Sequence, residues 1–578
     1  MAKLFALNGV IVTVVLTPLN AERFNMVIDQ AIASNLKIHF LLLPFPCVEA
    51  GLPKGCENMD ILPSPKYQPL FFAACNMLKE PLENWLSELE KLPSCIVSDI
   101  CLPWTSNVAS KFNIPRVVFH GISCFTLLCS HNINLSKVHE RVDSMSTLFV
   151  VPDLPDTIEF TKAQLPEAMK QDSKAWKEAI NQFKEAELSA QGILVNTFEE
   201  LEKNYVRGYE KIAKKVWCIG PLSLHDKLTF DKFGKNDKGL IDDSESECLK
   251  FLISNKACSV IYVCFGSLSF IPASQLKELA LGLEASNHPF IWVIGKNDCS
   301  IELEKWLREE NFEERNKGRG VIIKGWAPQV KILSHPSTGG FLSHCGWNST
   351  LEAISGGVPM ITWPMFAEQF FNEKLIVQVL KIGVRIGVEV VVDPMDTFKG
   401  EKILVKKEDV KMAIEKLMEN GVEGELRRKR VKEIKDMAYK AVEDGVSKWM
   451  DRMNLDWIVN EWIKVVVTTG QRRSTPDLRR WRGGGSKFSG GLTVVRCGAP
   501  ATGTKRHAGI SMKKEAPVNF LTDPQEGRST LRPVDVLVYG WVGGKHACVD
   551  LTGVSPLVGL GVGDFTMGRT ALKAASSN

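Results

Sequence analysis

The stretch that decides the fold runs from Trp326 to Gln369 and reads WAPQVKILSHPSTGGFLSHCGWNSTLEAISGGVPMITWPMFAEQ. Within it, an apolar strand from Gly340 to Ser343 leads into a polar turn. We predict a helix from about Thr350 to Ser355, which Gly356 and Gly357 close. A second apolar strand, Met360 to Trp363, follows. This order of strand, turn, helix and strand indicates a βαβ unit of a parallel sheet.

The turn before this helix predicts an anion site. The first N–H groups of a helix have no partners within the helix, and the helix dipole favours negative charge at that end. We expect Asn348 or Ser349 to cap the helix. Glu352 lies on the same face, where its carboxylate can accept hydrogen bonds from a sugar diol. Trp326 offers a flat surface for a base.

An ordinary βαβ unit does not need His344, Asn348, Ser349, Glu352 and Gln369 together. A purely structural role therefore explains the stretch poorly. From Trp-Ala-Pro-Gln, through His-Cys-Gly-Trp-Asn-Ser, to the closing Glu-Gln, it resembles the signature of the plant UDP-glycosyltransferases of family 1. The resemblance implies an α/β protein of GT-B architecture, with two Rossmann-like βα domains facing each other across a cleft. It also implies transfer of a hexose from a UDP-sugar to a hydroxyl of a small acceptor, with inversion.

The family pattern assigns the donor site residue by residue. Trp326 is expected to stack on the uracil, Ala327 and Gln329 to hydrogen-bond to it, Glu352 to hold the ribose, His344, Asn348, Ser349 and Ser267 to meet the phosphates, and Trp347, Glu368 and Gln369 to face the hexose. A closing Gln is the glucose-type ending in this family, so UDP-glucose is the expected co-substrate. For Ser267 the alternative is a simple turn serine.

We expect no other cofactor and no metal ion. His344 and the helix dipole can carry the charge of the leaving group. The sequence also has no D-x-D motif and no metal-spaced cluster of His and Cys.

The catalytic base poses a problem. The family carries its catalytic His in a loop after the first strand, and Met1 to Ala6 resembles the end of the helix that follows this loop. We therefore expect the first strand and the His loop to be missing, and the edges of the neighbouring strands to be exposed. Asp99 matches the family's catalytic Asp that orients this His. Loss of a general base costs about 10²–10⁴-fold in rate, so we expect an intact donor site with little or no transferase activity.

His120 is the nearest other candidate for a base at the end of a strand. We interpret it as structural, because its Phe-His-Gly setting is not catalytic in the family.

Apolar strands separated by amphipathic helices predict parallel sheets that are covered on both faces. The expected strands are Val10–Leu16, Ile38–Leu43, Cys95–Ser98, Arg116–Phe119 and Ile193–Asn196, and then Val260–Cys264, Phe290–Ile294 and Val321–Ile323. We divide the chain into an N-terminal acceptor-binding domain (1–223), a polar interdomain linker (224–247), a C-terminal UDP-sugar-binding domain (248–446) and a tail that departs from the family (447–578).

The tail is rich in Gly, Ser and Arg and loses periodicity, which predicts a largely disordered segment. Its last part, from about Ala516, resembles read-through from transposon-related plant sequence. For Arg472 to Arg506, a nucleic-acid-binding arm is the functional alternative. From Lys464 onward 17 Lys and Arg face 7 Asp and Glu, so residues 1–463 carry a net charge of −6 although the whole chain carries +4. This acidic body argues against nucleic acid as its partner.

The cysteines, the apolar runs and the N-terminus indicate a cytoplasmic protein, which we expect to be a monomer. The 15 cysteines are scattered without a C-x-x-C pair, as expected for buried reduced thiols. No apolar run is long enough to cross a bilayer. The N-terminus mimics a signal peptide, but Asn8 and Gly9 interrupt its apolar core, so we favour a piece of a folded domain over secretion.

Three other interpretations are open. A nucleotide-binding oxidoreductase would need G-x-G-x-x-G after a first strand, and the Gly-rich pieces at 483–491 and 559–563 lack that spacing. A non-catalytic protein that keeps UDP-sugar affinity is the second, and a faulty gene model, truncated at the 5′ end and fused downstream to foreign sequence, is the third. Segments such as Leu43–Pro53 resemble a branch of the plant enzymes that acts on flavonoids, triterpenoids and other hydroxylated metabolites.

Overall fold

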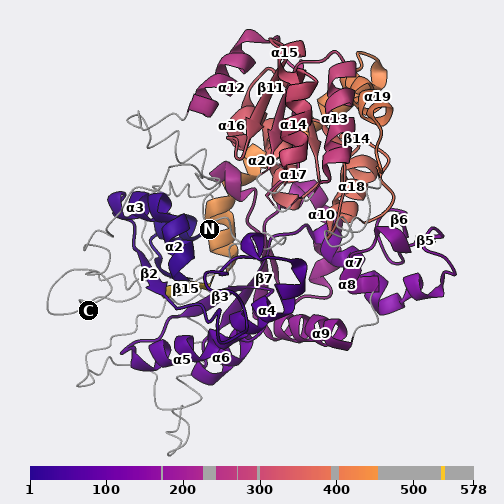
Figure 1. Ribbon diagram of the computed structural model, residues 1–578. Coiled ribbons are helices and arrows are strands. Elements are labelled where there is room, and N and C mark those ends of the chain that lie inside the picture. The colour runs from indigo at the N-terminus through magenta and orange to yellow at the C-terminus, as the bar shows by residue number, and fades with distance from the viewer. Residues whose placement is uncertain are drawn as a thin grey trace, which may run out of the picture. The chain divides into compact units, whose positions relative to one another are not determined.

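The computed structural model describes residues 1–170, 174–225, 243–267, 269, 271–295, 298, 300–391, 403–453 and 535–539. These described residues belong to one compact unit. The unit contains two parallel sheets with helices around them (Figure 1). Most of the predicted linker (226–242) and most of the predicted tail (454–534 and 540–578) lie outside the described residues.

The first sheet has seven strands in the order β2-β1-β15-β3-β4-β7-β8, and every neighbouring pair is parallel. The strands are β1 (Ile11–Leu16), β2 (Ile38–Leu42), β3 (Cys95–Asp99), β4 (Arg116–His120), β7 (Gly192–Val195), β8 (Val216–Cys218) and β15 (Asp535–Tyr539). Every residue of β3, β4 and β7 is buried, which is why these strands read as continuous apolar runs. The five strands predicted for this half are confirmed within about two residues at each end.

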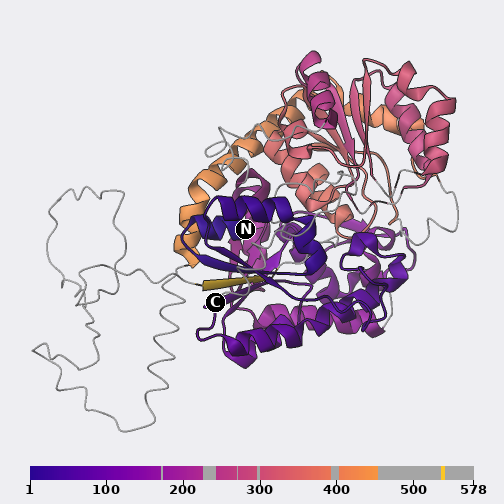
Figure 2. The ribbon, with the colours of Figure 1, turned by 60° about the vertical axis from the view of Figure 1, so that its left-hand side comes forward.

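The open strand edges expected in this sheet are not found. Strand β15, from the tail of the chain, lies between β1 and β3 and pairs with both of them (Figure 2). Leu537 is in register with Thr13 on one side and with Ile96 on the other. The expectation of exposed edges was therefore wrong, because five residues of the tail fill the position with their own backbone.

The helices of this half are α1 (Ala2–Leu7), α2 (Pro18–Arg23), α3 (Asn25–Ala33), α4 (Gln68–Met77), α5 (Lys79–Glu88), α6 (Thr105–Phe112), α7 (Cys124–Ser136), α8 (Glu167–Lys170), α9 (Lys174–Ser189) and α10 (Glu199–Glu210). Strands β5 (Leu148–Val150) and β6 (Glu159–Thr161) form a separate antiparallel hairpin. The buried carboxylate of Glu202 joins α10 to the start of α7, because it accepts hydrogen bonds from the N–H groups of Cys124 (3.1 Å) and Phe125 (2.6 Å). Burial raises the pKa of Glu202 to about 7.

The second sheet has six parallel strands in the order β11-β10-β9-β12-β13-β14. These strands are β9 (Val260–Cys264), β10 (Phe290–Ile294), β11 (Gly320–Lys324), β12 (Thr338–Ser343), β13 (Met360–Thr362) and β14 (Gly383–Arg385). The helices around them are α12 (Asp243–Ser254), α13 (Ala273–Ala285), α14 (Ile301–Glu309), α15 (Phe312–Arg315), α16 (Gln329–Ser334), α17 (Trp347–Gly356), α18 (Gln369–Lys374) and α19 (Lys407–Met418). A Cβ at Gly339 would lie 2.3 Å from the carbonyl oxygen of Cys258, so the start of β12 requires glycine.

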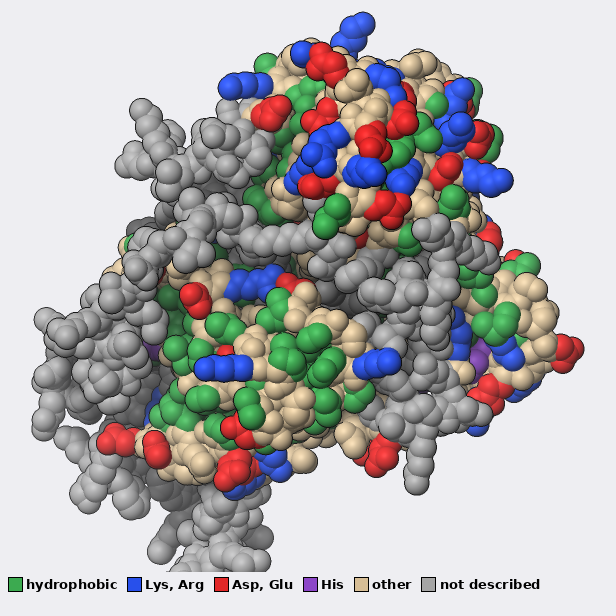
Figure 3. Space-filling model, viewed as in Figure 1, with side chains coloured by type: hydrophobic (Ala, Val, Ile, Leu, Met, Phe, Trp, Pro, Cys, Tyr) green, Lys and Arg blue, Asp and Glu red, His purple; other side chains and the backbone are tan. Residues whose placement is uncertain are grey.

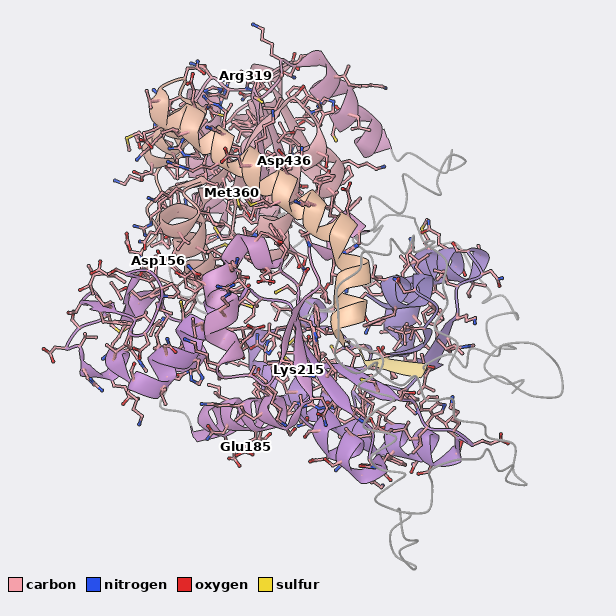
Figure 4. All side chains as sticks on the ribbon, turned by 180° about the vertical axis from the view of Figure 1, so that it is seen from behind. Asp156, Glu185, Lys215, Arg319, Met360 and Asp436 are labelled. Atoms are coloured by element: carbon pink, nitrogen blue, oxygen red, sulfur yellow. The ribbon has the colours of Figure 1, made fainter. Side chains whose placement is uncertain are left out.

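The second half ends in two helices, α19 and the long α20 (Val422–Met453). Helix α20, on which Figure 4 labels Asp436, packs against α17 of the second half and α10 of the first. The ammonium group of Lys435 donates to the carbonyl oxygen of Gly356 (3.0 Å), at the end of α17. Helix α20 thereby supports the helix of the signature stretch.

Basic and acidic side chains are interspersed over the helices of the second half (Figure 3). Several form surface ion pairs, such as Lys277–Glu302 at 2.6 Å and Arg315–Glu284 at 2.9 Å. Among the residues that the structure describes, no helix combines the length and apolar character needed to cross a bilayer.

Candidate functional site

The predicted donor residues gather where the strands of the second sheet end. Ser267 follows β9, Trp326 follows β11, and His344 follows β12 directly. Since the strands are parallel, these three loops lie along the same edge of the sheet, where α/β proteins bind ligands. The signature stretch therefore forms one side of a site at this edge.

The His344 ring lies between two glycines. A Cβ at Gly266, whose φ is +78°, would come within 2.8 Å of the ring, and a Cβ at Gly346 would come within 2.4 Å of its Nε2 atom. Burial lowers the pKa of His344 to about 4, although contact with the backbone of Cys264 acts in the opposite direction. The imidazole is therefore neutral near pH 7, so its ring can act as a neutral N–H donor but not as a cation.

This buried imidazole predicts a pH dependence of stability. The pKa of His344 is about 4 in the folded protein against an ordinary 6.5, so the unfolded state takes up a proton first as the pH falls. From about pH 8 to about pH 5, we expect the free energy of unfolding of wild type to fall by about 1–2 kcal/mol more than that of His344→Gln. Urea unfolding at both pH values measures this difference. Parallel pH profiles would contradict it.

Helix α17 begins earlier than predicted. Its first residue is Trp347, its N-cap is Gly346, and no side chain caps it, so the prediction that Asn348 or Ser349 caps the helix was wrong. Both residues lie in the first turn instead. The Asn348 side-chain oxygen accepts a hydrogen bond from the amide of Asn196 (3.1 Å).

The side chain of Gln329 organises the polar cluster beside this helix. Its amide nitrogen donates to Ser349 Oγ (3.1 Å) and to Glu352 Oε2 (2.7 Å), and its oxygen accepts from the Tyr262 hydroxyl (3.2 Å). Ser349 and Glu352 thus share a face, as the sequence predicted. Trp326, in the loop that leads into α16, is partly exposed, whereas Ala327 is buried.

Asn196 is a contributor that the sequence reasoning did not select. The indole N–H of Trp347, a side chain 2% exposed, donates to the Asn196 carbonyl oxygen (2.7 Å). The side-chain oxygen of Asn196 also accepts from the N–H of Leu222 (3.1 Å). One residue at the end of β7 therefore holds two residues of the signature stretch. No local pattern could have revealed it, since the partners lie 151 and 152 positions apart.

Glu368 and Gln369 are both buried at the start of α18. The side-chain oxygen of Gln369 accepts hydrogen bonds from the N–H groups of Met365 (2.8 Å) and Phe366 (3.1 Å). This oxygen holds the turn before the helix, so a sugar hydroxyl would meet the NH2 group of the same amide.

Asp99 and His120 lie at the ends of β3 and β4 in the first sheet. The Asp99 carboxylate accepts from the N–H of Cys101 (2.8 Å), and burial raises its pKa to about 6. No histidine side chain hydrogen-bonds to it among the residues that are described. His120 instead contacts Glu187 (2.6 Å), which also accepts from the hydroxyl of Tyr209 (2.5 Å), and this supports its structural interpretation.

Within the described ranges, no group of three or more His, Cys, Asp or Glu side chains is arranged to hold a metal ion.

Comparison with known proteins identifies the family. The family model described as UDP-glucoronosyl and UDP-glucosyl transferase matches residues 225–421. UDP-glycosyltransferase 73C3 of Arabidopsis thaliana is 51% identical over 450 residues, which cover 77% of this chain and 90% of that protein. The chain belongs to the plant family 1 UDP-glycosyltransferases. UDP-glycosyltransferase 73C10 of Barbarea vulgaris is 49% identical over 452 residues, with the same two coverages.

Solved structures show that this plant UDP-glycosyltransferase has the GT-B fold. UGT73P12 of Glycyrrhiza uralensis, complexed with glycyrrhetinic acid 3-O-monoglucuronide, is 35% identical and superimposes with a TM-score of 0.71, covering 81% of this chain and 95% of that one. UGT2 of Phytolacca americana, complexed with UDP-2fluoro-glucose and pterostilbene, is 26% identical with a TM-score of 0.58, covering 77% and 99%.

Proposed function

We propose that the protein transfers glucose from UDP-glucose to a hydroxyl of a plant secondary metabolite of flavonoid or triterpenoid type, with inversion. The observation that carries this proposal is the cluster of Gln329, Ser349 and Glu352 at the first turns of α17. A carboxylate held by a neighbouring amide is suited to a ribose diol, and the helix N-terminus is suited to a diphosphate. The Phytolacca complex, which holds UDP-2fluoro-glucose and pterostilbene, supports this assignment.

In the proposed reaction, an acceptor hydroxyl oxygen attacks the anomeric carbon while the bond from that carbon to the diphosphate oxygen breaks. The hydroxyl proton passes to a base, and UDP leaves with the bonding electron pair. His344 is expected to donate a neutral hydrogen bond to the diphosphate, and the start of α17 adds its dipole. No step needs a metal ion, so EDTA is expected to leave UDP binding unchanged.

The base limits the rate in this proposal. Asp99 accepts a hydrogen bond from the backbone N–H of Cys101, and no histidine hydrogen-bonds to it in the described part of the chain. We therefore propose slow turnover with an intact donor site. A UDP-sugar-binding protein without catalysis is the second candidate, favoured by the same contrast between the hydrogen-bonded Gln329 cluster and an Asp99 carboxylate to which no described histidine hydrogen-bonds. We also propose that the protein acts as a monomer in the cytoplasm.

Binding of UDP tests the donor site. UDP at about 100 times its Kd is expected to stabilise the folded protein by about 2.7 kcal/mol, seen as a rise in Tm. Trp326→Ala removes the surface on which the base stacks and should abolish most of this rise. Trp306→Ala is the matched control, since Trp306 contacts Phe312 away from the signature stretch. Well-folded protein that shows no UDP-dependent shift would refute the donor site.

Turnover separates the two candidate functions. Purified protein is incubated with UDP-glucose and a panel of hydroxylated flavonoids and triterpenoids, and glucosides are quantified by mass spectrometry. We expect UDP binding with product formation about 10²–10⁴-fold below that of an active relative assayed in parallel. Equal rates would overturn slow turnover, and binding with no product at all would favour the non-catalytic candidate.

A further inference from the structure

The first sheet contains a strand from the far end of the chain. Strand β15 (Asp535–Tyr539) lies between β1 and β3, with Val536 in register with Val12 and Cys95, and Val538 in register with Val14 and Val97. Both pairings are parallel, and the strand follows the same direction as its neighbours (Figure 2). Strand β15 belongs to the same compact unit as both of its neighbours.

The position that β15 fills is deeply buried. On its two sides, Val12, Val14, Ile96 and Val97 are each no more than 1% exposed. An empty position would leave one row of N–H and C=O groups on β1 and another on β3 without backbone partners. Buried groups of this kind each cost about 1–3 kcal/mol when they are unpaired. The sheet therefore requires an occupant that supplies backbone hydrogen bonds on both sides.

The sequence of β15 suits this requirement. Asp-Val-Leu-Val-Tyr is rich in β-branched and aromatic residues, which favour strands. Residues 454–534 separate it from the end of α20, and a segment of that length is ample to let the same chain reach the sheet. Tyr539 is in register with Ser98, so the strand ends at the edge of the sheet where Asp99 lies.

We propose that the C-terminal extension is a built-in complementing strand for the acceptor half. Residues Asp535–Tyr539 of the same chain occupy the position between β1 and β3, close the first sheet, and hold the end of β3 that carries Asp99. Strand β15 is thus part of the folded protein, and this inference does not depend on the proposed sugar donor or acceptor.

A disulfide trap tests the register directly. Val536 is the partner of the native Cys95, and partnered Cα atoms of adjacent strands lie within the range that a disulfide spans, roughly 4.4–6.8 Å. Burial raises the pKa of the Cys95 thiol to about 12, so the full-length Val536→Cys variant is refolded in a glutathione buffer to let the bond form during folding. Val538→Cys is the control, because its partners are Val14 and Val97.

Peptide mapping reads the result. In Val536→Cys we expect a crosslink within one chain between Cys95 and the introduced thiol, at a yield at least about tenfold above any crosslink from Cys95 to the thiol introduced in Val538→Cys. Equal yields, or no crosslink, would overturn the assigned register. A crosslink between two chains would overturn the same-chain occupant in favour of a tail exchanged between copies.

Hydrogen exchange on the full chain provides a second, independent readout. Leu537→Pro removes an N–H from a strand with neighbours on both sides, whereas Leu557→Pro places the same change elsewhere in the extension. We expect amides of β1 and β3 to exchange at least about tenfold faster in Leu537→Pro, with amides of β9 and β12 in the second sheet unchanged. The proposal fails if Leu537→Pro and Leu557→Pro exchange alike.

Discussion

Replacing Arg385 with alanine is expected to lower the free energy of unfolding by about 3–5 kcal/mol. The Arg385 Nε atom lies 2.7 Å from Glu373 Oε1, and the Glu373 side chain is completely buried. The Thr362 hydroxyl donates to the other carboxylate oxygen (2.7 Å). Without the guanidinium, a charge would stay buried with one neutral hydrogen bond, which costs far more than an exposed ion pair contributes.

The loss should depend on pH in a defined direction. Burial raises the pKa of Glu373, and Arg385 opposes that rise, so the pKa climbs further in the variant. A carboxyl group with a raised pKa stabilises the folded state at low pH and loses that contribution as the pH rises through the folded-state pKa. The difference between Arg385→Ala and wild type should therefore be largest at alkaline pH and smaller in mild acid.

Arg315→Ala is the matched control for this measurement. Arg315 pairs with Glu284 at 2.9 Å, but its side chain is 37% exposed, so the same substitution should cost no more than about 1 kcal/mol. Urea unfolding of both variants gives the comparison. Equal losses at the two sites would show that the Glu373 pair is no more important than a surface pair.

Local pattern was enough to predict much of the second half. Strands β9 and β10 have the predicted bounds, because each is a continuous apolar run between turn residues. The start of α17 was placed three residues too late, because Trp347 looks like part of a turn until its burial against Asn196 is known. Contacts with Asn196 and Tyr262 join distant positions, so no periodicity encodes them.

Strand β15 shows the same limit for the fold. The run from Val534 to Tyr539 is visibly apolar, yet nothing in its sequence predicts which sheet it joins. Alternation and composition specify a strand and its faces, whereas pairing depends on which backbone edges are open elsewhere. The gap between β1 and β3 could be anticipated from the resemblance, but its occupant could not.

Glu352→Ala is expected to weaken UDP binding by about 10–100-fold, equivalent to about 1.5–3 kcal/mol for hydrogen bonds to a charged group. Glu352, on α17, accepts from Gln329 at 2.7 Å, which fixes one carboxylate oxygen. Removing it takes away the proposed ribose contact and also leaves the Gln329 amide with one partner fewer. Glu284→Ala, a surface substitution on α13, should leave the Kd unchanged.

A modified ligand can show whether Glu352→Ala weakens binding through the lost ribose contact or through the lost hydrogen bond to Gln329. If Glu352 binds the ribose hydroxyls, wild type should bind 2′-deoxy-UDP about tenfold more weakly than UDP, whereas Glu352→Ala should bind the two equally. If Glu352 only positions Gln329, both proteins should discriminate between the two ligands to the same extent, because the hydroxyl contact would then be made elsewhere. Calorimetry of four combinations, two proteins with two ligands, therefore isolates the contact between carboxylate and ribose from the hydrogen bond that supports it.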